Sequence, residues 1–199
     1  MTSILVVCTG NICRSPLAEG FLRSILVRRF AEAAPTVSSA GTAGWEGSPA
    51  MAESVQAASE RDVDISGHLA RKLGPPMVEH ADLVLCMARE HRDAIIRANP
   101  AAEPRVFTLK ELVRLLEALA PPANGAPEAL VDRVAQASAE REAGFKGNPL
   151  DEDIADPLSQ PLEAYRGIAW ELDTWSLRLA EGLFGKAEVP TSIFGEAGR

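Results

Sequence analysis

The sequence predicts an α/β fold with a four-stranded parallel sheet flanked by helices on both sides. Short apolar runs alternate with stretches whose apolar residues recur every three or four positions, which is typical of strands alternating with helices. The run at residues 82–87, Asp-Leu-Val-Leu-Cys-Met, is almost continuously apolar, as strands covered on both faces require. A length of 199 residues suits one domain with a sizeable core.

The first strand and the first helix are predicted at the N-terminal end. Residues 4–7 are apolar and mostly β-branched, which indicates a buried strand. Leu17, Phe21 and Ile25 then recur at four-residue spacing, on one face of a helix. We expect Ser15 to be the N-cap of this helix, with Pro16 in its first turn and an end before Pro35.

The remaining elements follow in alternation. Further strands are predicted at 36–41, 82–87 and 106–108, and helices at 50–61, 89–99, 110–119 and 163–183. Residues 115–150 are expected to be a helical insertion, with an amphipathic helix over 130–142 between segments rich in Pro and Gly. The insertion is interpreted as a stabilising decoration, and the alternatives are a cap on the cleft or a partner site. Residues 1–199 then form one domain, with 185–199 as a flexible tail.

The connection between the first strand and the first helix predicts an anion site. Backbone N–H groups of a tight loop and a helix N-terminus attract anions, and Arg14 adds a planar fork for two phosphate oxygens. We expect Gly10 to supply a positive φ and Asn11 to tolerate the left-handed region. The same surroundings favour the thiolate form of a cysteine at the position of Cys8. Thiolate, anion cradle and arginine in a Cys-x5-Arg pattern are the parts needed for nucleophilic attack on phosphorus.

Composition and charge narrow the function further. Hydrophobic residues make up 46% and charged residues 24%, which is ordinary for a globular protein, and the net charge of −8 argues against nucleic acid or an anionic membrane as partner. Neither a signal peptide nor a membrane-spanning stretch is visible. Three cysteines are too few for a disulfide framework, and a thiol nucleophile needs a reducing compartment, so we expect a cytoplasmic protein. Three dispersed histidines lack metal-ligand spacing, and neither a metal nor another cofactor is expected.

The string Val-Cys-Thr-Gly-Asn-Ile-Cys-Arg-Ser-Pro at 7–16 resembles the active-site loop of the low-molecular-weight protein tyrosine phosphatases, and segments 39–42, 65–68, 70–71 and 85–87 resemble further parts of that family. The resemblance implies a phosphatase I-like, flavodoxin-like fold. It also implies that Ser39 and His68 support the loop through Asn11 and Ser15. The residues it implies for phosphate binding are Thr9, Gly10, Asn11, Ile12, Cys13, Arg14 and Ser15.

An Asp-Pro pair late in the chain completes the resemblance. Pro157 disfavours helical geometry at Asp156, so this carboxyl is expected to project from a loop, and the resemblance implies that it is the acid that protonates the leaving oxygen. The acids at 151–153 are expected to be a solvated loop. Trp45 is either a wall of the substrate cleft, as the resemblance implies, or a loop aromatic that fills a gap. Leu158 stands where phosphotyrosine-specific relatives commonly have an aromatic, which weakens the case for stacking a phenol ring.

These residues predict a phosphatase that forms a cysteinyl-phosphate on Cys8, acts on protein phosphotyrosine or a small aryl phosphate, and is inhibited by phosphate or vanadate. The alternative of a protein-arginine phosphatase is favoured by Thr9 and opposed by Ile12, whose flat apolar side chain suits an aromatic ring. An arsenate reductase needs resolving cysteines after the third strand, and none follows Cys86. A non-catalytic phosphate-binding adaptor would be signalled by loss of the cysteine, arginine or acid. Cys13 is either a resolving thiol for oxidised Cys8 or a packing residue.

Overall fold

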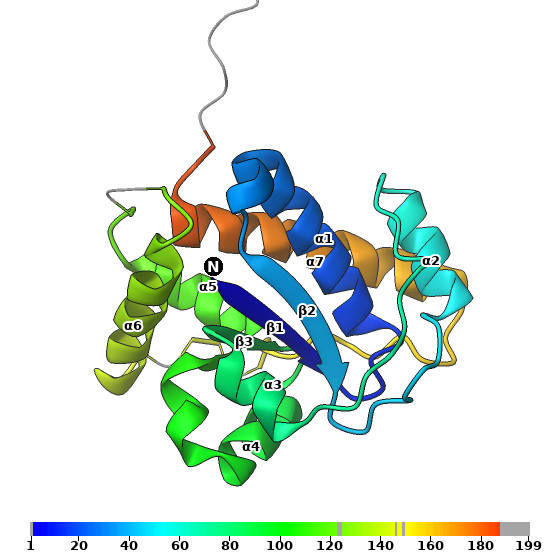
Figure 1. The fold of residues 1–199 in the computed structure, drawn as a ribbon, viewed down its shortest axis with the longest axis horizontal. Coiled ribbons are helices and arrows are strands. Elements are labelled where there is room, and N and C mark those ends of the chain that lie inside the picture. The colour runs from blue at the N-terminus through cyan, green and yellow to red at the C-terminus, as the bar shows by residue number, and fades with distance from the viewer. Residues whose placement is uncertain (1, 123–124, 146, 149, 188–199) are drawn as a thin grey trace, which may run out of the picture.

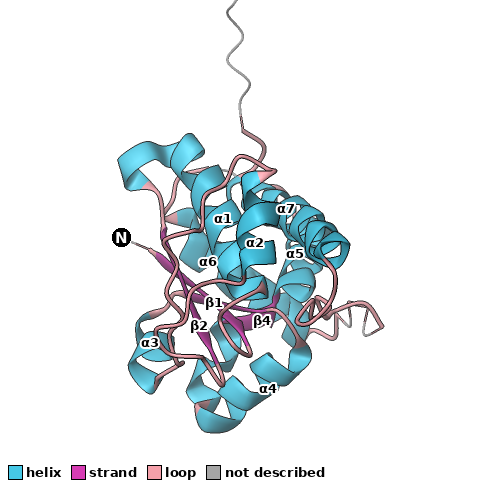
Figure 2. Cartoon of the chain, turned by 90° about the vertical axis from the view of Figure 1, so that its right-hand side faces the viewer, coloured by secondary structure: helices cyan, strands magenta, loops and turns pink. Residues whose placement is uncertain are grey.

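A parallel sheet lies at the centre of the structure, a computed structural model that describes residues 2–122, 125–145, 147–148 and 150–187. All four strands run parallel, in the order β2-β1-β3-β4. Figure 1 labels β2, β1 and β3, and Figure 2 labels β4. Their bounds are β1 Ser3–Cys8, β2 Thr36–Gly41, β3 Leu83–Cys86 and β4 Val106–Thr108. The predicted fold class is confirmed, and β2 and β4 have the predicted bounds.

Helices cover both faces of the sheet (Figure 2). Ile4 and Val6 of β1 belong to the larger core, which contains residues of α1 (Arg14–Phe30), α2 (Ala52–Ser59), α5 (Leu109–Ala118), α6 (Ala129–Glu142) and α7 (Leu162–Phe184). Leu5 and Val7 point the other way and pack with residues of α3 (Pro75–His80) and α4 (Arg89–Ala98). Burial on both faces explains why β1 reads as a continuous apolar run.

The strand order places the candidate loop at a switch point of the sheet. The chain passes from β1 to β2 on one side and later returns to β3 on the other side of β1. Cys8, the last residue of β1, pairs with Gly41, and Val7 pairs with Cys86. Ligands of open α/β sheets bind outside the carboxyl ends of the strands at such a switch point, and Cys8 lies there.

Two local predictions at the start of α1 are wrong. The helix begins at Arg14 with Cys13 at the N-cap position, not Ser15, because the Ser15 hydroxyl is engaged by the Asn11 amide 2.8 Å away. Gly10 does not take a positive φ, whereas Asn11 does, with φ of 58°. A Cβ on residue 10 would stand 3.3 Å from Cγ1 of Ile12, so close approach accounts for the glycine.

Other elements differ from the prediction in length or were not predicted. α2 begins only at Ala52, because Met51 is extended and donates its N–H to the Ile12 carbonyl of the loop, 2.8 Å away. α3 was not predicted, since it spans six residues that start with two prolines and contain one buried side chain, Val78. Two short 3₁₀ helices, Ala31–Ala33 and Pro100–Arg105, were not predicted either.

The region expected to be an insertion contains α6, close to the predicted 130–142. Its apolar residues Leu130, Val134 and Ala137 are buried in the larger core, which places α6 against α5 and α7. Residues 123–124, 146 and 149 of this region, and 188–199 of the expected tail, lie outside the described residues. Among the described helices, none has the length and apolar character that crossing a bilayer requires.

Candidate active site

The loop from Cys8 to Cys13 turns its carbonyl oxygens outward. Five consecutive carbonyls, those of residues 8–12, accept hydrogen bonds from the N–H groups of Thr42, Ala43 and Trp45, from His68 Nε2 and from the N–H of Met51, over 2.8–3.0 Å. Each trans peptide unit points its N–H away from its carbonyl, so the N–H groups of residues 9–13 face the concave side. The segment after β2 therefore shapes the loop into an anion cradle.

Close backbone approach at Gly41 makes this arrangement possible. A Cβ at position 41 would lie only 2.4 Å from the Thr9 carbonyl oxygen, a distance that no side chain tolerates. The glycine therefore lets the end of β2 lie against the loop, where the N–H groups of Thr42 and Ala43 donate to the carbonyls of Cys8 and Thr9.

The side chain of Asn11 fastens the loop from inside. It is fully buried, and its amide nitrogen donates to the hydroxyls of Ser15 and Ser39, each at 2.8 Å. Its oxygen accepts the backbone N–H of Arg71, also at 2.8 Å. Asn11 thus holds its left-handed backbone by bonds to α1, β2 and the segment before α3. The structure brings together the support residues expected at positions 39 and 68.

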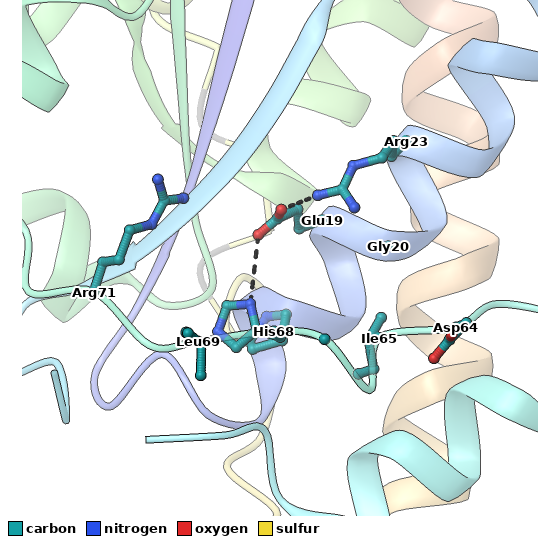
Figure 3. Close-up of a pocket in the computed structure, with 10 residues that line it drawn as sticks. Glu19, Gly20, Arg23, Asp64, Ile65, His68, Leu69 and Arg71 are labelled. Atoms are coloured by element: carbon teal, nitrogen blue, oxygen red, sulfur yellow. Dashed lines mark hydrogen bonds and ion pairs between the residues drawn. The ribbon is translucent and has the colours of Figure 1, made fainter. Parts of the chain in front are cut away.

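A carboxylate lies behind these supports. Glu19 on α1 points between His68 and Arg23 (Figure 3), pairs with the Arg23 guanidinium, accepts from the Ser39 hydroxyl, and stands 3.9 Å from His68 Nδ1. His68 Nε2 must carry a proton to bond the Asn11 carbonyl, since that oxygen only accepts. Glu19, Arg23 and His68 line a cavity of about 490 Å³, bounded also by Ile65 and Arg71.

Cys8 lies on the concave side of the cradle. Its buried Sγ accepts the N–H of Asn11 at 3.3 Å and lies 3.0 Å from the Ser15 hydroxyl. Both groups donate to a thiolate, and hydrogen bonds to the charged form stabilise it. Two hydrogen-bond donors are thus directed at the Cys8 sulfur.

Arg14 crosses the mouth of the cradle. Its Nη1 donates to the Ile154 carbonyl at 3.2 Å, and its Nη2 contacts Asp156 Oδ2 at 2.5 Å and Thr9 Oγ1 at 3.4 Å. Arg14 Nε is buried and has no hydrogen-bond partner among the described residues. Buried donors are rarely left unpaired, so this N–H is a group that a bound oxyanion would satisfy.

A histidine that the sequence gave no reason to select contacts the same loop. His91 of α4 is buried, and its Nε2 lies 2.9 Å from Thr9 Oγ1 and 3.5 Å from Glu90 Oε1. Burial and the positive charge of Arg14 lower the pKa of His91, so its ring is neutral at neutral pH. Nδ1 has no partner among the described residues. An unpaired buried N–H is costlier than an unpaired acceptor, which favours the proton on Nε2.

Asp156 reaches the cradle from the loop before α7. Its side chain is 43% exposed, and besides Arg14 it binds the N–H of Leu158, which is 3.1 Å from Oδ1. Asp156 and Cys8 line the same pocket of about 130 Å³. Its other lining residues are Thr9, Gly10, Ile12, Cys13, Arg14, Trp45 and Leu158. Trp45 and Leu158 are both partly exposed and form the outer walls.

Cys13 is buried beneath the loop. Burial raises the pKa of Cys13 to about 11. Cys13 also forms a hydrogen bond with Tyr165 of α7, and burial is the main cause that raises the pKa of Tyr165 to about 12. Cys13 is therefore a protonated thiol at neutral pH. Both cysteines are free.

The residues that support the pocket come from distant parts of the chain, and only some of them carry a signal in the sequence. Glu19 lies one helical turn after Ser15, a spacing that places both side chains on the same face of α1. His91 and Tyr165 sit in amphipathic helices and looked like ordinary core or surface positions. Within the part of the chain that the structure describes, no three His, Cys, Asp or Glu side chains are grouped to hold a metal ion.

Comparison with known proteins agrees with this geometry. Residues 3–136 match the family described as low molecular weight phosphotyrosine protein phosphatase. A protein-arginine-phosphatase of Geobacillus stearothermophilus is 31% identical over 180 residues, which is 90% of this chain and 95% of that protein. The low molecular weight protein-tyrosine-phosphatase Etp of Escherichia coli K12 is 45% identical over 89 residues, 45% of this chain and 56% of Etp.

Solved structures extend the likeness over nearly the whole chain. The crystal structure of a low molecular weight protein tyrosine phosphatase from T. tengcongensis has a TM-score of 0.68 and 32% identity, and the match covers 92% of this chain and all of that one. Solved structures with names of both kinds, tyrosine and arginine phosphatases, thus share the fold of this chain.

Proposed function

The chain belongs to the low molecular weight phosphotyrosine protein phosphatase family, and we propose that it hydrolyses protein phosphotyrosine through a phosphocysteine on Cys8. The observation that carries this proposal is the cradle itself. The inward N–H groups converge on the side where the Cys8 sulfur lies, together with Arg14 Nε, which has no partner among the residues that the structure describes; Asp156 stands at the mouth of the cradle. A cradle lacking nucleophile or acid would only bind an anion, whereas here all three chemical groups line one pocket.

The reaction proceeds in two displacements at phosphorus. The Cys8 thiolate attacks, an S–P bond forms and the bond to the leaving oxygen breaks while Asp156 gives that oxygen its proton. Water then attacks the phosphocysteine, Asp156 takes a proton from it, and the S–P bond breaks to release inorganic phosphate and thiolate. Arg14 and the loop N–H groups hold the equatorial oxygens, and the Ser15 hydroxyl stabilises the departing sulfur. No electrons are exchanged and no cofactor takes part.

Ile12 supports an aromatic substrate. Its side chain is buried and lines the pocket near Trp45, so the two offer apolar surface on which a phenol ring can lie. Leu158 supplies a third apolar wall but no ring, so we propose weaker binding of phenyl phosphates than an aromatic residue would give there. A guanidinium, by contrast, would find no polar partner on Ile12.

Protein phosphoarginine is the second candidate substrate. It is favoured by the protein-arginine-phosphatase that is 31% identical over most of the chain, and by Thr9, which lines the pocket. The proposed preference for phosphotyrosine places the weight on Ile12 at the pocket wall instead. An arsenate reductase remains a poor fit, since Cys86 is fully buried in β3 and no cysteine follows it.

A panel of substrates decides between these candidates. Phosphotyrosine, phosphoserine and phosphoarginine peptides of matched sequence are compared by kcat/KM, with arsenate reduction measured in parallel. We expect phosphotyrosine to be preferred. The variant Ile12→Thr should shift the ratio toward phosphoarginine, and Ile12→Val is the matched control that keeps an apolar wall. Preference for phosphoarginine in the wild type would overturn the choice of substrate and leave the cysteine chemistry standing.

A further inference from the structure

The acidic run before Asp156 is a loop whose Asp151 and Asp153 are exposed, as the sequence suggests, but its acids also make ion pairs with two helices. Each of the three consecutive acids forms ion pairs with its own basic side chains. Asp151 contacts Lys110 at 2.7 Å and Arg114 at 2.5 Å. Glu152 is buried and lies 3.4 Å from Arg92. The cations come from two helices, α4 and α5, so the run is held by ion pairs to both helices.

Asp153, the last acid of the run, binds the first residue of α4. Its two oxygens lie 3.0–3.3 Å from Nε and Nη2 of Arg89, and Oδ1 also accepts the Arg89 backbone N–H at 2.8 Å. Arg89 is the first residue of α4, whose own N-cap residue, Ala88, has no side-chain acceptor. Asp153 therefore caps α4 from another segment, satisfying one of the unpaired N–H groups at the positive end of the helix.

Ile154, the next residue, connects this ion pair to the pocket through its backbone. Its N–H donates to the Met87 carbonyl at 2.8 Å, its carbonyl accepts from Arg14 Nη1 at 3.2 Å, and its side chain is buried. Only Ala155 separates this fixed residue from Asp156. Residues 143–161 otherwise contain no helix or strand in the described part, and loops of this length are mobile unless tied down.

We propose that the ion pairs of residues 151–153 with α4 and α5 hold Asp156 at the mouth of the pocket, and that Arg89 is a positioning residue for the acid step. The proposal rests on the proposed role of Asp156. An acid acts only within hydrogen-bond reach of the leaving oxygen, and a displacement of about 1 Å costs up to about 100-fold in rate. The simpler interpretation is that these pairs add only a little stability, as exposed ion pairs commonly do.

The leaving group separates the two interpretations. A misplaced acid slows substrates whose leaving oxygen has a high pKa, whereas an activated aryl phosphate departs without a proton. We measure kcat/KM, which covers the steps up to the phosphocysteine, for a series of aryl phosphates in wild type, Arg89→Ala and Arg89→Lys. We expect Arg89→Ala to lose about 10-fold on the poorest leaving group and less than about twofold on the best, with Lys restoring part of the loss.

A second ion pair of the same exposure provides the control. Arg166 binds Glu60 at 2.7 Å with side chains 43% and 40% exposed, against 44% and 41% for Arg89 and Asp153, and it lies outside the residues that line the pocket. Arg166→Ala should leave the leaving-group slope unchanged while lowering the melting temperature about as much. An equal slope in Arg89→Ala and Arg166→Ala would overturn the positioning role.

Asp156→Asn in the same series identifies which claim fails. A steeper slope in Asp156→Asn with a wild-type slope in Arg89→Ala would refute the anchor alone. An equal loss of kcat/KM on all leaving groups in Asp156→Asn would refute the role of Asp156 as the acid, and the positioning role of Arg89 with it. The double variant Arg89→Ala/Asp153→Ala should be no slower than Asp153→Ala, since both changes break the same link.

Discussion

Replacing Asn11 by alanine tests how the cradle is held. The substitution removes three hydrogen bonds of 2.8 Å, to Ser15, Ser39 and the N–H of Arg71, at a fully buried site. A buried polar group without its partner costs about 1–3 kcal/mol. The two serine hydroxyls keep other partners, Cys8 and Glu19, so we take about 1 kcal/mol for each lost bond.

The backbone adds a separate contribution. Asn11 has φ of 58°, and an alanine in this left-handed region costs about 1 kcal/mol that a glycine does not. The free energy of unfolding should therefore fall by about 4 kcal/mol in Asn11→Ala and by about 3 kcal/mol in Asn11→Gly. Both values come from urea unfolding followed by tryptophan fluorescence.

The pair of variants makes the reasoning refutable. Losses below about 1 kcal/mol in both would show that the loop does not depend on the three bonds. Equal losses in Asn11→Ala and Asn11→Gly would show that the left-handed backbone relaxes in the variant. Activity should be lost in both, because the N–H groups no longer converge on one point.

Three further predictions concern substrate, redox state and pH. Leu158→Tyr should lower KM for aryl phosphates, because a stacked ring contributes about 0.5–1.5 kcal/mol to binding. An unchanged KM would show that residue 158 does not face the substrate. Peroxide should oxidise Cys8 first, and the burial-raised pKa of Cys13 predicts that a Cys8–Cys13 disulfide forms faster at alkaline than at neutral pH. Intact mass before and after dithiothreitol checks this, with equal recovery in Cys13→Ser counting against it. The Arg89 guanidinium lowers the pKa of Asp153 in the folded protein. The contribution of this ion pair to stability is therefore fully present above the ordinary aspartate pKa of about 4, and it is lost as pH falls through the lower pKa of the folded state. Urea midpoints of wild type and Asp153→Asn should converge in that range, and a constant gap would contradict the pairing.

Local signals carried the prediction of the fold and of the cradle. The apolar run of β1, the change to helical spacing after Pro16 and the alternation of later elements are all readable within a few residues. The order from Cys8 to Arg14 indicates the proposed nucleophile and arginine, and the Asp-Pro pair singles out Asp156 as the proposed acid.

Contacts between distant segments could not be read in this way. His91 and Thr9 are 82 positions apart and Arg89 and Asp153 are 64 apart, so neither pairing leaves a periodic or spacing signal. Ser15 looked like an N-cap because local rules favour it, but the buried amide of Asn11 competes for its hydroxyl. The positive φ of the turn lies at Asn11 and not at Gly10. Position 10 requires a glycine because a Cβ there would crowd Ile12.

The covalent step on Cys8 is tested most directly by trapping it. Asp156→Asn lacks the base for the second displacement, so an activated aryl phosphate should load the enzyme faster than water unloads it. After rapid quenching, mass spectrometry should find one phosphoryl group on the peptide that contains Cys8, and none after Cys8→Ala. Continued turnover in Cys8→Ala, or a phosphoryl group attached to any residue other than Cys8, would contradict the proposed mechanism.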